Sequence, residues 1–336
     1  MQTAVRIIQG QIDSGVLAAA VLQVRRGRET FRQSFGRAQD ADAIFLLASI
    51  TKPMTAAGVM VLADRGELRL SDRVVRFIPE FREGARQEIT IAHLLTHTSG
   101  LPDQLDDNAE LRSRHAPLAE FVRGAVRAPL RFPPGTKYHY QSMGLLLAAE
   151  IVERLTRTAL PEFLAREVFG PLGMERSALG LGRFRLEETI RCQTERAAPE
   201  AGAGDPATAS WDWNSPYWRN LGAPWGGAHG SAADVARFLE AFLHPDGRVL
   251  REETARLMVQ NHTPGLEAAR GIGFALGPAG FGKGCSEKCF GHAGATGTIA
   301  WADPATDTTC VLLTSLPMHL SAAAVLQPVC DAVSGR

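Results

Sequence analysis

The chain has 336 residues and is 45% apolar, so it can bury a sizeable core in one large domain or two closely joined ones. Lysine plus arginine and aspartate plus glutamate both total 36, so no net charge draws the molecule to nucleic acid or an anionic membrane. We therefore expect a globular protein whose partners are small molecules.

The amino-terminal residues 1–15 lack the charged start, apolar run and cleavage site of a secretory signal, which predicts residence in the cytoplasm. No segment approaches the roughly 20 apolar residues that cross a bilayer, so no membrane insertion is expected. Of the five cysteines only Cys285 and Cys289 lie close in sequence, and free thiols are favoured over a disulfide or half a metal site.

Two β-rich segments, residues 19–24 and 30–35, flank a charged turn and predict an antiparallel hairpin. A helix is predicted over residues 49–65, which are apolar nearly all round and are followed by Gly66. Such a helix belongs in the core of the protein.

The middle of the chain, from about residue 90 to residue 257, has mainly helical patterns. The predicted helices cover residues 91–96, 118–126, 143–155, 160–169 and 232–242. Residues 197–225 are rich in Ala, Gly, Pro and Trp without periodicity, which predicts a long surface excursion.

Strand patterns return near the carboxyl terminus. Strands are predicted over residues 271–276, 298–301 and 308–314, and a closing helix over residues 321–333. Strands at both chain ends predict an α/β (α+β) fold, in which an antiparallel sheet built from both termini is flanked by helices and carries an inserted helical domain. The predicted division assigns residues 1–85 and 258–336 to the sandwich and residues 86–257 to the helical domain, with a cleft between them.

Ser49 and Lys52 are spaced three residues apart at the start of the predicted helix, which places their side chains on one face. A serine at a helix start also exposes its backbone N–H, and the helix dipole there favours a developing oxyanion. Alone, this spacing is common, and a serine N-cap beside a solvated lysine is the alternative interpretation.

Two further motifs follow in order. Residues 134–142 read Pro-Gly-Thr-Lys-Tyr-His-Tyr-Gln-Ser, and residues 290–297 read Phe-Gly-His-Ala-Gly-Ala-Thr-Gly. With the Ser-x-x-Lys tetrad, they make the chain resemble the serine β-lactamase and penicillin-binding protein superfamily, in its class C and family VIII carboxylesterase-like branch. Softer matches at residues 94–101 and 226–238 extend the resemblance over about residues 45–315.

The resemblance implies a role for each motif. Ser49 would be the nucleophile, Lys52 would accept its proton, and Tyr140 would relay that proton to the leaving group. The oxyanion hole would combine the N–H groups of Ser49 and Ala295, and Gly294 would let the backbone approach the substrate. We expect no metal and no cofactor.

Two positions depart from the family pattern. Ser142 replaces the Asn of Tyr-x-Asn; its hydroxyl can bond Lys52 or a substrate carbonyl but offers one donor where an amide offers two. His292 replaces the Lys of Lys-Thr-Gly and is largely neutral near pH 7 unless perturbed, so a substrate carboxylate should bind less well.

Two other groups of residues have competing interpretations. His93 and His97 lie one helical turn apart as zinc ligands sometimes do, but position 94 lacks the Glu of a metalloprotease, so structural roles are favoured. A tryptophan group either pins a loop to the body or forms an apolar wall for an acyl or alcohol group. Its members are Trp211, Trp213, Trp218 and Trp225.

The expected function is that of an esterase-like hydrolase acting on small or medium acyl esters. A β-lactamase or D-amino-acid peptidase is the first alternative, because it uses the same nucleophile on an amide bond. The second alternative is a non-catalytic protein of the same fold that binds a ligand or partner, and the presence of Ser49, Lys52 and Tyr140 argues against it. The sequence leaves the oligomeric state open.

Overall fold

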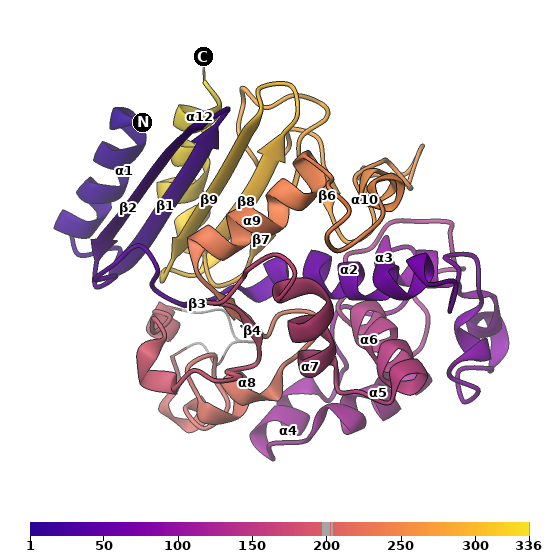
Figure 1. The fold of residues 1–336 in the computed structure, drawn as a ribbon. Helices are drawn as coiled ribbons and strands as arrows, with labels where there is room; N and C mark the ends of the chain where they lie inside the picture. Colours follow the sequence, from indigo (N-terminus) through magenta and orange to yellow (C-terminus); the bar gives the residue numbers. More distant parts are fainter. Residues whose placement is uncertain (197–201, 203, 336) are drawn as a thin grey trace.

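A computed structural model describes residues 1–196, 202 and 204–335. Its larger sheet has six antiparallel strands in the order β2-β1-β9-β8-β7-β6, so both chain ends build it together (Figure 1). The strands are β1 (Ala19–Arg26), β2 (Glu29–Gly36), β6 (Ala275–Leu276), β7 (Phe290–Gly294), β8 (Thr298–Asp303) and β9 (Thr308–Thr314). The predicted fold class is confirmed, as is the amino-terminal hairpin.

Helices cover both faces of this sheet. α1 (Gln2–Asp13) and α12 (Gln327–Ser334) lie on one face, and α9 (Ala232–Leu243) lies on the other (Figure 1). Side chains alternate between the faces: Cys310 and Leu312 of β9 join the core under α1 and α12, whereas Val311 and Leu313 join the core under α9. A strand buried on both faces shows a continuous apolar run, as residues 310–313 of β9 do.

The amino-terminal helix α1 was not predicted. Only Ala4 and Ile8 of this helix are buried, and they pack into the core that α12 shares. A short helix with so small an apolar face is stabilised by docking rather than by its own propensity. The local pattern of residues 1–15 therefore carried little signal.

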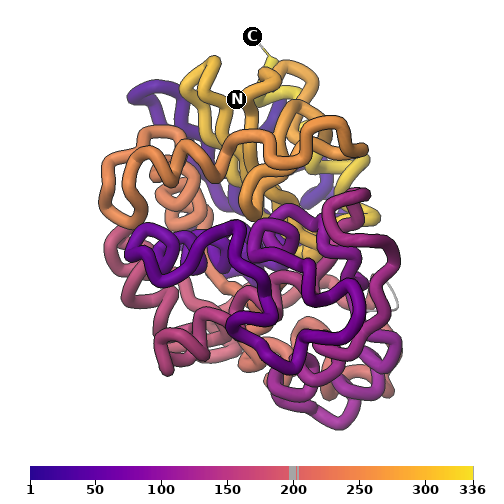
Figure 2. The backbone as a smooth tube through the Cα atoms, turned by 90° about the vertical axis from the view of Figure 1, so that its right-hand side faces the viewer, coloured from indigo at the N-terminus to yellow at the C-terminus, as the bar shows by residue number. Residues whose placement is uncertain are grey.

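The rest of the molecule is mainly helical, and both chain ends lie on the opposite, sheet side (Figures 1 and 2). α2 (Thr51–Asp64) packs against α6 (Met143–Thr156), although the sequence assigned it to the sandwich. The other helices are α3 (Ile91–Leu95), α4 (Asn108–Ser113), α5 (Leu118–Arg127), α7 (Leu160–Leu164), α8 (Pro216–Leu221), α10 (Glu252–Met258) and α11 (Met318–Ser321). The domain division at residues 85/86 and 257/258 stays a prediction.

A second sheet joins three short strands in the order β3-β5-β4. They are β3 (Phe45–Leu46), β4 (Ala178–Leu179) and β5 (Ala228–Gly230). Strands of two or three residues leave no alternating pattern to detect. This sheet matters because β3 leads directly to Ser49.

The prediction of a surface excursion over residues 197–225 was wrong for residues 211–225, whereas residues 204–210 are mostly exposed. Helix α8 lies within it, and Arg219 is fully buried. Its four tryptophans, Trp211, Trp213, Trp218 and Trp225, are each no more than 8% exposed. A segment without periodicity can still be buried when large aromatic rings anchor it.

Smaller differences concern the ends of elements. The strand predicted over residues 271–276 is confined to β6, because Gly273 adopts a φ of 80° and breaks the extended chain. The five cysteines, Cys285 and Cys289 included, are buried free thiols. In the described part of the chain, no helix is long and apolar enough to cross a membrane.

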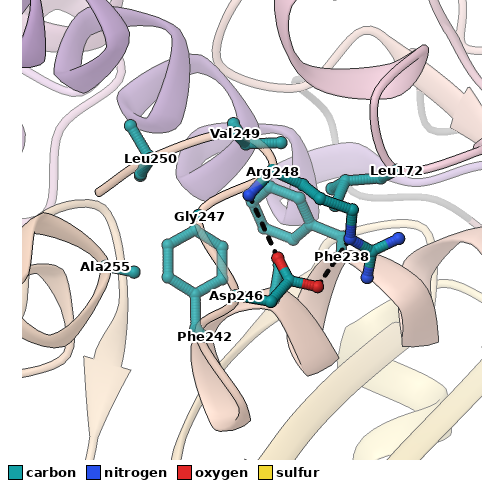
Figure 3. A pocket seen from close by; sticks show the side chains of 10 residues that line it. Leu172, Phe238, Phe242, Asp246, Gly247, Arg248, Val249, Leu250 and Ala255 are labelled. Atoms are coloured by element: carbon teal, nitrogen blue, oxygen red, sulfur yellow. Dashed lines mark hydrogen bonds and ion pairs between the residues drawn. The ribbon is translucent and has the colours of Figure 1, made fainter. Parts of the chain in front are cut away.

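A narrow pocket lies beside α9, between Phe238, Phe242 and Leu172 (Figure 3). It encloses about 10 Å³, which is room for one water molecule at most. The Asp246 carboxylate accepts a hydrogen bond of 2.6 Å from Arg248 Nε at its edge. This pocket is therefore a packing feature and not a substrate site.

Candidate active site

Ser49 is held at the junction between the small sheet and α2. The Leu47 N–H donates to the Ala228 carbonyl at 2.8 Å, which continues the pairing of β3 with β5. Ala48 then adopts a φ of 48°, a left-handed conformation that costs a non-glycine residue about 1–3 kcal/mol. The single 3₁₀ turn Ala48–Ile50 includes this residue and places Ser49 two residues before the start of α2 at Thr51.

Lys52 lies beneath Ser49 and is only 1% exposed. Its Nζ donates to Ser49 Oγ at 3.2 Å and to the Trp225 carbonyl at 2.9 Å. Thr55, one turn further along α2, donates its hydroxyl to the Pro224 carbonyl at 2.7 Å. These bonds hold the start of α2 against the chain that leads into β5, so the amine is fixed beside the serine hydroxyl.

The surroundings of Lys52 favour its neutral form. Burial lowers the pKa of Lys52 to about 7, Asp103 opposes this shift, and Arg270 adds to it. Near neutral pH a large fraction of the amine is therefore unprotonated and able to accept a proton.

Tyr140 also lies beside the serine: both residues line the same cavity, and the Ser49 hydroxyl opposes the rise in the pKa of Tyr140. The Lys52 Nζ lies 4.7 Å from the centroid of the Tyr140 ring. Burial raises the pKa of Tyr140, so its phenol stays protonated at neutral pH. The structure thus brings Ser49, Lys52 and Tyr140 together although 88 or more residues separate Tyr140 from the other two.

The two histidines of residues 93–97 support this arrangement. His97 Nδ1 accepts a hydrogen bond of 3.2 Å from the Gln141 N–H, and its ring lies 4.7 Å from the Tyr140 ring. His93 caps the start of α3, where its Nδ1 accepts from the Thr90 N–H at 3.2 Å. Within the ranges that the structure describes, no three His, Cys, Asp or Glu side chains gather to hold a metal ion.

The turn between β7 and β8 lies next to Ser49. Thr296 and Thr298 donate their hydroxyls to the carbonyls of Leu46 and Leu47 at 2.8 and 2.9 Å. Ala295, at the tip of the turn, lines the same cavity as Ser49. Among the described residues, neither the Ser49 N–H nor the Ala295 N–H donates to a protein acceptor, so both are available to an oxyanion.

Gly294 permits this close approach, because a Cβ on it would overlap the Leu47 carbonyl oxygen and the Thr298 hydroxyl. We expect Gly294→Ala to push the turn away from Ser49 and to lower kcat by about 10²-fold, the effect of losing one oxyanion donor. Steady-state kinetics on an ester substrate would measure the loss. Gly10→Ala is the matched control, because nothing lies within 4 Å of its Cβ position; equal rates in both variants would contradict the prediction.

His292 carries no positive charge. Its Nδ1 donates to the Ala293 carbonyl at 2.8 Å, and its Nε2 accepts from the Arg270 guanidinium at 3.3 Å. Burial, Arg270 and Lys52 hold the pKa of His292 well below its usual value. Arg270 itself is 6% exposed and packs 5.8 Å from the Tyr138 ring, and no carboxylate of the described residues forms an ion pair with it.

Arg270 is a residue that sequence reasoning missed. It lies 22 residues before His292 in a segment without a motif, and only the fold brings the two together. The sequence predicted only a weak cation, the imidazole of His292, whereas the structure places the permanently charged guanidinium of Arg270 beside it.

Ser142 contacts a second missed residue. Its hydroxyl donates to Asp103 Oδ1 at 2.6 Å, and of the two partners considered from the sequence, Lys52 instead donates to Ser49 and to the Trp225 carbonyl. Asp103 follows the Leu-Pro pair of residues 101–102, close to a segment that the sequence did single out. Nothing in the sequence indicated that the Asp103 carboxylate would contact Ser142.

A cavity of about 140 Å³ opens over Ser49. The expected site residues Tyr140, Ser142 and Ala295 line it. The remaining lining residues are Leu46, Ala48, Asp103, Gln104, Arg112, Trp213, Trp218, Trp225, Gly226 and Thr296. Trp211 is not among them; its ring packs 5.0 Å from the Arg112 guanidinium.

Comparisons with known proteins identify the family of the chain. A family model described as Beta-lactamase matches residues 4–324. The chain is 33% identical to Esterase EstB of Burkholderia gladioli over 297 residues, which cover 78% of this chain and 74% of that protein. It is 32% identical to Penicillin-binding protein 4 of Amycolatopsis lactamdurans over 280 residues, with coverages of 78% and 68%.

Two solved structures share the fold. EstCE1, described as a hydrolase with promiscuous acyltransferase activity, matches 99% of both chains with a TM-score of 0.79 at 22% identity. The D-amino acid amidase from Ochrobactrum anthropi SV3, complexed with D-phenylalanine, also matches 99% of both chains, with a TM-score of 0.77 at 23% identity. At these identities, the likeness shows the arrangement of the elements and no more.

Proposed function

The chain belongs to the beta-lactamase family and is a serine hydrolase, and on this premise we propose that it hydrolyses small or medium acyl esters through an acyl-enzyme at Ser49. The observation that carries the proposal is the buried Lys52 amine, 3.2 Å from Ser49 Oγ, with its pKa lowered to about 7. A neutral amine at that distance can take the serine proton during attack.

In the proposed reaction, Ser49 Oγ bonds to the acyl carbon while its proton passes to Lys52. The N–H groups of Ser49 and Ala295 would stabilise the oxyanion that forms. Tyr140, which stays protonated, would donate a proton to the departing alkoxide and recover one from Lys52. Water then attacks the acyl carbon, and the same groups return the proton to Ser49 as the acid leaves.

Two observations favour an ester over an amide. Ser142 already donates its hydroxyl hydrogen to Asp103, so it offers little to the amide side chain of a lactam or peptide. The relative with 33% identity is named an esterase. The alkoxide of an ester is also a better leaving group than the amide ion of an amide, so ester cleavage depends less on proton donation by Tyr140.

A panel of chromogenic acyl esters tests the proposal, together with the intact mass of protein treated with an organophosphonate. We expect turnover of short and medium acyl chains and a single adduct on Ser49. Folded protein that neither turns over any ester nor takes up the label would overturn the proposal.

Arg270 favours a second candidate, the hydrolysis of β-lactams or peptides that carry a carboxylate. Its buried guanidinium has no carboxylate partner among the described residues and adjoins His292, the position where the family places its cation. A charged hydrogen bond contributes about 1.5–3 kcal/mol, so this site could restore the affinity that His292 lacks.

We expect Arg270→Gln to raise KM for a chromogenic cephalosporin by about tenfold or more, if that substrate is turned over, because the cation that faces its carboxylate is removed. The ratio of cephalosporin to neutral-ester kcat/KM isolates this effect, because a change in the pKa of Lys52 alters both rates alike. Arg251→Gln, at an exposed arginine that pairs with Asp64, serves as the control. An unchanged ratio would show that Arg270 does not bind the carboxylate of the substrate.

A further inference from the structure

The cavity over Ser49 holds one carboxylate, that of Asp103, among the residues that line it. Asp103 Oδ1 accepts a hydrogen bond of 2.6 Å from Ser142. Within the described ranges, no protein donor bonds its Oδ2 and no cation forms an ion pair with it. Half-buried carboxylates usually have such partners, because desolvation penalises an uncompensated charge.

The cations near Asp103 are occupied elsewhere. Lys52 donates to Ser49 and to the Trp225 carbonyl, and Arg270 donates to His292. The Arg112 guanidinium stacks 4.0 Å from the Trp218 ring and donates to the Trp211 carbonyl. The carboxylate nevertheless acts on its surroundings, since it opposes the fall in the pKa of Lys52. One oxygen of Asp103 therefore remains for a ligand.

The walls of the cavity suit a cationic group. Trp213 and Trp225 line it, and the faces of aromatic rings attract ammonium ions by about 0.5–2 kcal/mol, whereas the ring of Trp218, which also lines it, already carries the Arg112 guanidinium at 4.0 Å. A carboxylate beside indole rings combines a charge partner with a surface that excludes water. Both features favour a small cation over an acyl chain without charge.

The size of the cavity limits the distance between that cation and the reacting carbonyl. Ser49 and Asp103 line the same space of about 140 Å³, which is similar to an engineered cavity of about 150 Å³ that accepts benzene. A molecule that reaches both residues can therefore have only a few atoms between its amine and its acyl carbon. Small α- and β-amino acids meet this condition.

We propose that Asp103 binds a cationic amine on the acyl part of the substrate, so that the preferred substrates are esters or amides of small amino acids. This inference rests on the proposed function, because the acyl group must be delivered to Ser49. Ser49 Oγ would bond to the aminoacyl carbon, the alcohol or amine would leave with a proton, and one water would release the free amino acid. The amine would stay protonated on Asp103 throughout.

Two pairs of benzyl esters test the proposal: alanine against isobutyric acid, and β-alanine against butyric acid. In each pair an ammonium replaces a methyl group, so the members differ in charge at nearly constant shape. We expect the wild-type protein to favour the amino acid ester in kcat/KM by about tenfold or more, the value of one charged hydrogen bond. Both enantiomers of alanine would be tested.

Asp103→Asn should remove most of this preference, chiefly through KM, and Asp103→Glu should restore part of it. Asp106→Asn, at an exposed acid three residues away, is the matched control. Equal wild-type rates within both pairs, or an Asp103→Asn variant that slows both members equally, would overturn the proposal while Ser49 still labels and neutral esters still turn over. Failure of every ester together with failure to label Ser49 would instead reject the proposed function.

Discussion

Replacing Ser49 by alanine is expected to lower kcat/KM for acyl esters by about 10⁴-fold or more and to abolish phosphonate labelling. The reason is that, among the hydroxyls of the residues that line the cavity, only that of Ser49 is hydrogen-bonded to the Lys52 amine. Ser142 donates to the Asp103 carboxylate, and Thr296 donates to the Leu46 carbonyl. Initial rates on the best ester and the intact mass after labelling would measure both effects.

The matched control for this variant is Ser113→Ala. Ser113 is exposed at the end of α4 and donates only to the Glu110 carbonyl, so its loss should leave the rate unchanged. Circular dichroism would show that both variants fold. Full activity in folded Ser49→Ala protein would show that another residue is the nucleophile and that no acyl-enzyme forms at Ser49.

The parts of the fold that the sequence predicted are those whose apolar pattern is local. The hairpin of β1 and β2, the helix α6 and the strand β9 each show an apolar pattern within one segment. α1 and the tryptophan segment were missed because their burial depends on distant partners. α1 needs α12, more than 300 residues away, and Arg219 is buried by bonds to Ile190 and Thr189.

The site divides in the same way. Ser49 and Lys52 belong to one tetrad, and Tyr140 was identified through a motif, so each could be named without a structure. Asp103 and Arg270 belong to loops whose composition indicates no chemistry, and they reach the site through contacts with Ser142 and His292. The motifs therefore predicted the reacting groups, whereas the charges that would select the substrate depend on tertiary structure.

The activity is also expected to depend on pH through Lys52. Its amine must be neutral to accept the serine proton, and its pKa in the folded protein is about 7. kcat/KM should therefore rise with pH, fall about tenfold for each unit below pH 7, and level off above it. Lys52→Arg should lower kcat/KM by about 10³-fold or more at every pH, because a guanidinium cannot be deprotonated in a protein.

A pH–rate profile of the wild-type protein and the variant between pH 5 and pH 9 would measure both effects. Lys283→Arg is the control, since that lysine is exposed and pairs only with Asp331 among the described residues. Asp103 and Arg270 act on the pKa of Lys52 in opposite directions, so Asp103→Asn should move the acid limb to lower pH and Arg270→Gln to higher pH. An acid limb that stays in place in both variants, or one near the usual pKa of lysine at about 10.4, would show that another group accepts the proton.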